Sequence, residues 1–157
     1  MNKEINHYIT EFETIYDGEP WYGKPLMAVL KEADAKAVFK KQHKNGHSAY
    51  EVLHHVLAWR ELLVKRLNGD TQSTIKTDSE TDWSSLPEKQ TANEWNALVR
   101  KIQQNQKELI KSLSKWKDDS LDKNFAGSAY PLRTFLHGQI QHDIYHIGQI
   151  ALALKNA

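Results

Sequence analysis

Apolar side chains recur every three or four residues along four long stretches of the chain, and this spacing constrains the fold more than any other feature. The stretches cover residues 5–18, 48–67, 91–116 and 131–154. A period of 3.6 residues is that of an amphipathic α-helix, and no stretch shows the strict alternation typical of a half-buried strand. The sequence therefore predicts an all-α protein with a four-helix bundle as its architecture.

The predicted helix ends carry capping signals. Residues 48–51 and 91–94 are capping boxes, in which a hydroxyl residue precedes a glutamate by three positions. The Asn-Gly pair at 68–69 should stop the second long helix. Pro131 suits the first position of the last helix.

The connections are longer than tight hairpins. Pro25 can open a short helix and Asp34 can cap another turn, so short extra helical turns are predicted between the first and second long helices. Residues 70–89 are polar and rich in Ser, Thr and Asp, which predicts a long surface loop. A chain of 157 residues without internal repeats predicts one domain over residues 1–157.

Composition excludes several kinds of site and partner. The chain has no cysteine, so any metal ion must be bound by nitrogen and oxygen. Its 21 basic and 20 acidic residues are not segregated, which argues against a nucleic-acid partner. No apolar run approaches the length of a membrane span, and the first residues, MNKEINHYITEFE, are too charged for a signal peptide. We therefore expect a cytoplasmic protein without a membrane partner.

Two histidines of the last predicted helix, His142 and His146, are four residues apart and share one face of that helix. At this spacing two imidazoles can bind the same metal ion. On a helical wheel they share a strip with Gln139 and Gln149, away from the edge that should meet water. Buried polar groups need partners, so two interpretations remain: a shared metal ion, or two core histidines bonded to neighbouring groups.

The second predicted helix offers a third ligand. Its adjacent histidines are separated by the helical wheel, which places His54 opposite the apolar stripe and in solvent. His55 lies on the flank of the stripe, beside Trp59, and is the better candidate. Arg60 lies within the apolar stripe, and is interpreted either as a snorkelling side chain or as an anion clamp facing the site.

The remaining polar candidates are weaker. His43 and His47 have the same four-residue spacing, but they precede a helix, so they are interpreted as loop residues rather than as groups at the mouth of the site. Asp143, Gln139, Gln149 and Arg60 could orient an imidazole or a bound water. The simpler interpretation of Asp143 is a surface carboxylate or an ion pair between helices. Tyr145 is expected to serve packing rather than chemistry.

Two stretches resemble a known family. LHHVLAW, at 53–59, resembles the second-helix motif of the DinB/YfiT-like superfamily of metal-binding four-helix bundles, and HGQIQHDIYHIGQIALALK, at 137–155, is similar to its fourth-helix motif. The segments GEPWYGKPLMAVL and HSAYEVL are similar in kind and position. The resemblance implies a DinB/YfiT-like bundle and a metal site formed by His55, His142 and His146.

Three imidazoles leave coordination positions open, as in catalytic sites, and suit Zn²⁺ or Ni²⁺. The resemblance implies a metal-dependent enzyme, either a thiol S-transferase using a low-molecular-weight thiol such as bacillithiol, mycothiol or glutathione, or a hydrolase. The alternatives are a non-catalytic metal or small-ligand binding protein of the stress response, and a bundle fastened by a structural ion. No catalytic side chain is identified beyond the ion and its bound water. A small-molecule substrate and a homodimer are implied as partners.

Overall fold

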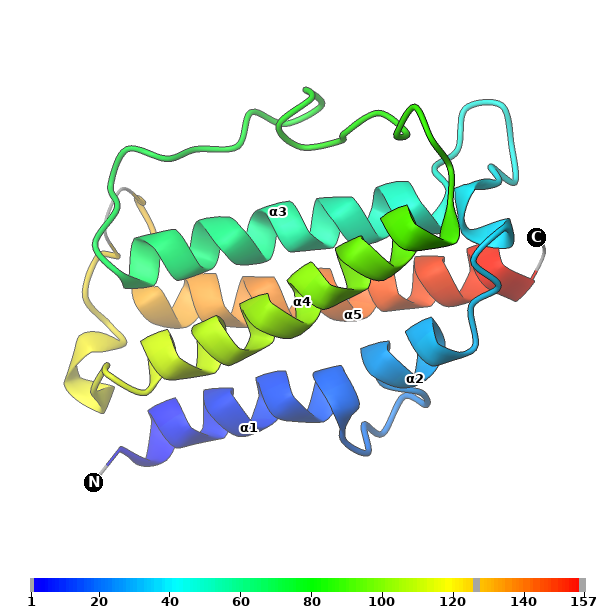
Figure 1. Cartoon of the computed structure of the whole chain (residues 1–157). Coiled ribbons are helices and arrows are strands. Elements are labelled where there is room, and N and C mark those ends of the chain that lie inside the picture. The colour runs from blue at the N-terminus through cyan, green and yellow to red at the C-terminus, as the bar shows by residue number, and fades with distance from the viewer. Residues whose placement is uncertain (1, 126–127, 156–157) are drawn as a thin grey trace.

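The computed structural model describes residues 2–125 and 128–155, and these residues form helices joined by loops. Four long helices make up the bundle: α1 (Lys3–Asp17), α3 (Ala49–Leu67), α4 (Ala92–Leu113) and α5 (Leu132–Lys155) (Figure 1). A short helix, α2 (Leu26–Lys31), and a 3₁₀ turn, η1 (Ala37–Phe39), lie between α1 and α3, and a second 3₁₀ turn, η2 (Asp118–Ser120), precedes α5. The all-α prediction and the extra turns before the second long helix are confirmed.

The helix ends lie close to the positions that the capping signals predict. The Ser48 hydroxyl accepts from the Glu51 amide at 3.2 Å, and the Glu51 carboxylate accepts from the Ser48 amide at 2.8 Å, which completes the capping box of α3. At the start of α4, the Thr91 hydroxyl accepts from the Glu94 amide at 3.3 Å. Two bounds differ from the expectation: α4 ends at Leu113, before Trp116, and α5 begins at Leu132, one residue after Pro131.

The four long helices enclose one apolar core. α3 packs against both α4 and α5, and α1 contacts α5 and α4 from the opposite side. α2 extends the layer of α1 and covers the far end of α5 (Figure 1). Fully buried side chains come from all four helices: Phe12, Leu53, Leu63, Ile102, Leu109, Leu136 and Ile150.

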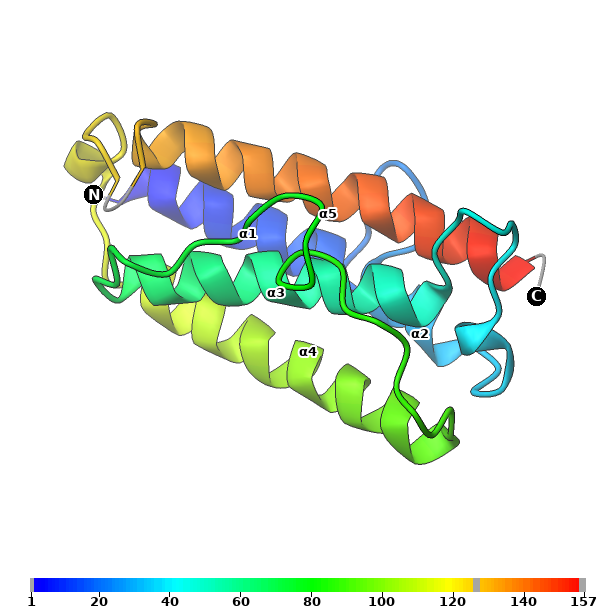
Figure 2. The ribbon, with the colours of Figure 1, turned by 90° about the horizontal axis from the view of Figure 1, so that it is seen from above.

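A long crossover connects α3 to α4. These two helices run in the same direction, so residues 68–91, here called the crossover loop, must return along the whole length of α3 (Figure 1, Figure 2). The loop was predicted to lie on the surface, and most of it does. The prediction is wrong for its centre, where Asp82 is only 3% exposed and Trp83 packs against the core.

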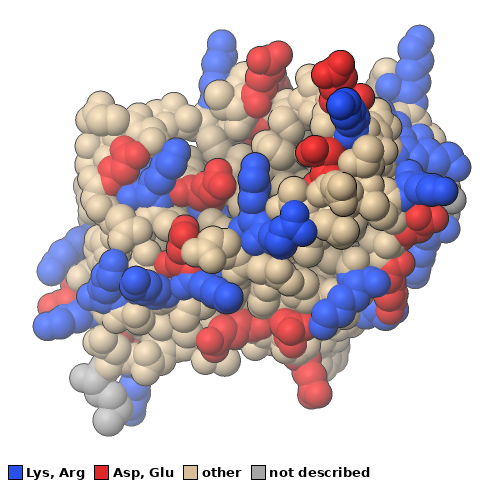
Figure 3. All heavy atoms as spheres, viewed as in Figure 1, with Lys and Arg blue, Asp and Glu red and all other residues tan. Residues whose placement is uncertain are grey.

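The surface is mixed in charge. On the face shown in Figure 3, basic and acidic side chains are interspersed over the helices. Among the described residues, no helix is sufficiently long and apolar to span a bilayer.

Candidate metal centre

His55, His142 and His146, here called the histidine cluster, meet between α3 and α5. One ring nitrogen from each lies within 4.8 Å of the others. The Nε2 atoms of His55 and His142 are 2.9 Å apart. The two helices bring these residues together because α3 and α5 pack side by side and because His142 and His146 occupy successive turns of one helix face.

The ring of His55 is fixed from behind by the crossover loop. Its Nδ1 lies 3.0 Å from the backbone carbonyl oxygen of Asp82 and 2.9 Å from Oδ1 of the same residue. A carbonyl oxygen can only accept, so Nδ1 carries the proton and Nε2 of the neutral ring presents its lone pair to the cluster. Burial lowers the pKa of His55, and the neighbouring His142 lowers it further.

His146 is held in the same way from its own helix. Its Nδ1 lies 2.7 Å from Oε1 of Gln149, which makes Nδ1 the donor and leaves the Nε2 lone pair for the cluster. Burial lowers the pKa of His146 to about 4, and the nearby His142 adds to that shift. The ring is therefore neutral at pH 7, the form that binds metals. Of the candidate orienting residues, Gln149 is therefore the one that contacts His146 directly.

His142 is the accessible member of the histidine cluster, with 25% of its side chain exposed. Its Nδ1 is buried without a hydrogen-bond partner among the described residues, and the nearest carboxylate oxygen, on Asp143, is 3.7 Å away. Two imidazole nitrogens bound to one ion lie about 3 to 3.5 Å apart. Three imidazole nitrogens are a donor set that fits a metal ion, and their separations, 2.9 Å for the Nε2 atoms of His55 and His142 and at most 4.8 Å overall, bracket that spacing.

Arg60 and Asp143 form a buried ion pair beneath the histidine cluster. Nε of Arg60 is 3.0 Å from Oδ2 of Asp143, and the side chains are 1% and 3% exposed. Gln139 donates to Asp143 at 2.8 Å, and Nη2 of Arg60 donates to Gln106 at 2.7 Å. Both interpretations of Arg60 are wrong, since it neither snorkels to solvent nor faces the site as a free clamp. Asp143 forms an ion pair between two helices and is not a surface carboxylate.

Sequence reasoning missed the groups that the crossover loop contributes. The Trp83 ring stacks on His55 with centroids 4.0 Å apart, and on its other face it stacks on His47 at 3.8 Å. Nε1 of Trp59 donates to the Asp82 carboxylate at 2.8 Å, which ties α3 to the loop. The only sequence signal was a single Asp-Trp pair in an otherwise small and polar stretch.

The other predicted residues lie nearby with smaller roles. His47 covers Trp83, so the less favoured interpretation, a place near the mouth of the site, is the better one. His54 is half-buried rather than fully in solvent as predicted, and burial lowers its pKa. Tyr145 is 65% exposed, although its ring touches His146 edge-on at 5.0 Å.

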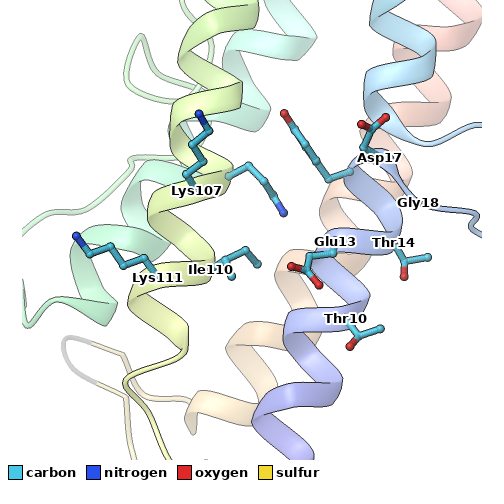
Figure 4. Close-up of a pocket in the computed structure, with 10 residues that line it drawn as sticks. Thr10, Glu13, Thr14, Asp17, Gly18, Lys107, Ile110 and Lys111 are labelled. Atoms are coloured by element: carbon cyan, nitrogen blue, oxygen red, sulfur yellow. The ribbon is translucent and has the colours of Figure 1, made fainter.

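Two cavities differ in their relation to the histidine cluster. A cavity of about 280 Å³, here called the aromatic pocket, adjoins it; the lining residues are Trp59, Tyr130, Thr134, Phe135, Gly138, Gln139 and His142. A second cavity of about 760 Å³ lies between α1 and α4, and its lining includes Glu13 and Asp17 of α1 and Lys107 and Lys111 of α4 (Figure 4). No residue of the histidine cluster lines the second cavity.

The fold and the histidine cluster define a class: a four-helix bundle with three histidines from α3 and α5 that could hold one metal ion. The family model of the DinB superfamily matches residues 24–150, and the chain belongs to this superfamily.

The structure is also similar to the crystal structure of a DinB-like protein from Bacillus cereus ATCC 10987. The TM-score is 0.64 at 17% sequence identity, over 99% of this chain and 93% of that one, which supports the fold. No curated protein matches the chain.

Proposed function

We propose that this protein binds one divalent metal ion, Zn²⁺ or Ni²⁺, through His55, His142 and His146, and that it is a metal-dependent enzyme. The carrying observation is the orientation of the rings. Nδ1 of His55 and Nδ1 of His146 are each held by an acceptor outside the histidine cluster, so the Nε2 lone pairs converge with the third imidazole. Imidazole ligands suit Zn²⁺ and Ni²⁺.

Three protein ligands leave positions for a substrate or a low-molecular-weight thiol. A bound ion would supply Lewis-acid chemistry, as thiol S-transfer or hydrolysis requires. The chain would contribute orientation and shielding: Asp82 and Gln149 hold the ligand rings, and Trp83 covers His55 from solvent. Substrate would approach past His142, whose side chain is 25% exposed.

A non-catalytic metal or small-ligand binding protein, acting in a stress response, is the alternative. The second alternative is a structural ion that only holds α3 against α5. Exchangeable ligands such as azide separate the structural ion from the other two, because a saturated ion does not bind them. Turnover separates the enzyme from the binding protein.

The first experiment is elemental analysis of protein purified without an affinity tag, beside the triple variant His55→Ala, His142→Ala and His146→Ala. We expect about one transition-metal ion per chain, lost in the triple variant. A native protein that carries no metal and does not take up Zn²⁺ or Ni²⁺ on titration would contradict the proposed site.

The enzymatic part needs a second experiment on the metal-loaded protein. We expect consumption of an electrophile in the presence of bacillithiol, mycothiol or glutathione, or hydrolysis of an ester or amide. The single variant His142→Ala should lose whichever of these two activities the native protein shows. Stoichiometric metal binding with no turnover in either screen would favour the binding protein.

The homodimer remains a separate proposal, supported by large side chains on the surface. Trp21 is fully exposed and Tyr145 is 65% exposed, and aromatic side chains are enriched in protein–protein interfaces. Sedimentation velocity should give twice the monomer mass, and Trp21→Ser or Tyr145→Ser should weaken the association. A monomer at every concentration would contradict it.

A further inference from the structure

The aromatic pocket opens from the one exposed member of the histidine cluster. His142 belongs both to the cluster and to the lining of this pocket. The His55 side chain is 6% exposed and His146 is equally buried. A molecule that reaches the histidine cluster along this route must therefore pass over Trp59 and Phe135.

The walls of the aromatic pocket are held in place before any ligand arrives. Trp59 is fixed by its hydrogen bond to the Asp82 carboxylate at 2.8 Å. Phe135 is backed by the guanidinium of Arg66, 5.3 Å from its ring centroid, and by the ring of Phe125 at the same distance. Preformed apolar walls are typical of small-molecule sites.

The lining also defines what the pocket can accept. Three of its residues are aromatic, Trp59, Tyr130 and Phe135, and among the described residues no lysine, arginine, aspartate or glutamate lines it. An anionic ligand would lose its hydration there without gaining a positively charged partner. An apolar ring would gain contacts with the faces and edges of three aromatic side chains.

The volume limits the size of the ligand. About 280 Å³ is at the lower end of the range for small-molecule pockets, so the site holds one ring rather than an extended molecule. Gly138 contributes to this space, because a Cβ built on it meets no atom within 4 Å.

We propose that the aromatic pocket binds an uncharged, apolar ring of the substrate and places the group attached to that ring beside His142. Binding of the ring stands independently of the proposed metal chemistry. Placement of the attached group at a metal ion rests on the proposed function.

Ring binding is tested on the metal-free, full-length chain by following backbone amide signals during titration with benzyl alcohol. We expect saturable shifts concentrated in residues 130–142. Benzoate carries the same ring with a negative charge, and should bind on the order of tenfold more weakly. Equal binding of benzoate, or shifts spread elsewhere, would overturn the proposal.

Two glycines of α5 provide matched variants. A Cβ on Gly138 or on Gly148 meets open space, so Gly138→Leu and Gly148→Leu place the same side chain on the same helix without a clash at Cβ. Gly148 lines a different cavity, between α2 and α5. Gly138→Leu should weaken the binding of benzyl alcohol on the order of tenfold, whereas Gly148→Leu should leave its affinity unchanged. Equal effects would overturn the assignment.

Placement of the attached group is tested on Co²⁺-loaded protein through its visible spectrum. Benzohydroxamate should bind roughly tenfold more tightly than acetohydroxamate, and Gly138→Leu should remove this preference. Equal affinities in a protein that binds Co²⁺ would show that the ring lies away from the metal and overturn the placement. Failure to bind Co²⁺ at all would refute the proposed function and, with it, the placement, while the metal-free titration still decides ring binding.

Discussion

At the scale of single residues, the chemistry depends on what lies behind each histidine. Both ring nitrogens of a histidine matter, because the partner of one fixes the tautomer and direction of the other. For His55 that partner is Asp82, through its backbone carbonyl and its carboxylate. Asp82 also accepts from Trp59 and from the Asp78 amide. One buried carboxylate thus joins the histidine cluster, α3 and the crossover loop.

Asp82→Ala should therefore weaken metal binding without abolishing it. Groups that orient metal-binding histidines typically contribute 10- to 100-fold in affinity, and we expect a loss at the lower end, roughly 10-fold, because the backbone carbonyl remains. Competition with a chromophoric chelator measures it. Glu80→Gln, at an exposed position two residues away, is the control. Unchanged affinity in Asp82→Ala would contradict the orienting role.

Acidification should destabilise the metal-free protein through His146. Its pKa is lowered from 6.5 to about 4 by burial, so between these values the unfolded chain binds a proton that the folded chain does not. Stability is then fully present above pH 6.5 and falls as the pH decreases toward 4. Urea unfolding across this range should give a shallower pH dependence for His146→Asn than for the original chain. Parallel curves would contradict the assignment.

At the scale of helices, a polar network crosses the centre of the bundle. Arg60 of α3 pairs with Asp143 of α5 and donates to Gln106 of α4, and Gln106 in turn donates to the Phe12 carbonyl of α1 at 3.3 Å. All four long helices are joined by these contacts. The network includes Asp143, which is adjacent in sequence to His142. It therefore also fixes the position of α5 along the axis of α3.

Removing one charge of this pair should cost more than removing both. Arg60→Met leaves the Asp143 carboxylate buried without its cation, which typically costs about 3–5 kcal/mol. The double variant Arg60→Met and Asp143→Leu should recover most of that loss, because neither charge remains. Urea denaturation of the single and double variants measures the difference. Additive losses would show that the two side chains act independently.

The helices could be predicted from the sequence because the signals that start and stop them lie within a few residues of the helix ends. The Ser48 box and the Asn-Gly pair after α3 act within a few residues, and they gave the bounds of that helix. His55, His142 and His146 were found because helical geometry fixes relative directions along α3 and α5. The position of Asp82 and Trp83 depends on a crossover without periodicity, and the pairing of Arg60 depends on a partner 83 residues away in the sequence. Neither the place of the crossover loop nor the Arg60 ion pair leaves a local pattern in the sequence.

At the scale of the whole molecule, a metal ion would join parts of the chain that are far apart in sequence. His55 and His142 are separated by 87 residues, and the α4 helix and the crossover loop lie between them. An ion that binds all three histidines binds the folded chain, since the unfolded chain does not bring them together. Its binding free energy therefore adds to the free energy of unfolding.

Zn²⁺ should consequently raise the stability of the whole bundle, by an amount that grows with the logarithm of its free concentration relative to the dissociation constant. At a free concentration one hundred times the dissociation constant, linkage predicts about 2.7 kcal/mol. The urea midpoint should rise with Zn²⁺, return to its starting value with a chelator, and keep the same slope, because the same surface is exposed on unfolding. The triple histidine variant should show no rise. An equal rise in that variant would place the stabilising ion elsewhere, whereas stoichiometric binding without any rise would mean that the unfolded chain binds Zn²⁺ equally well.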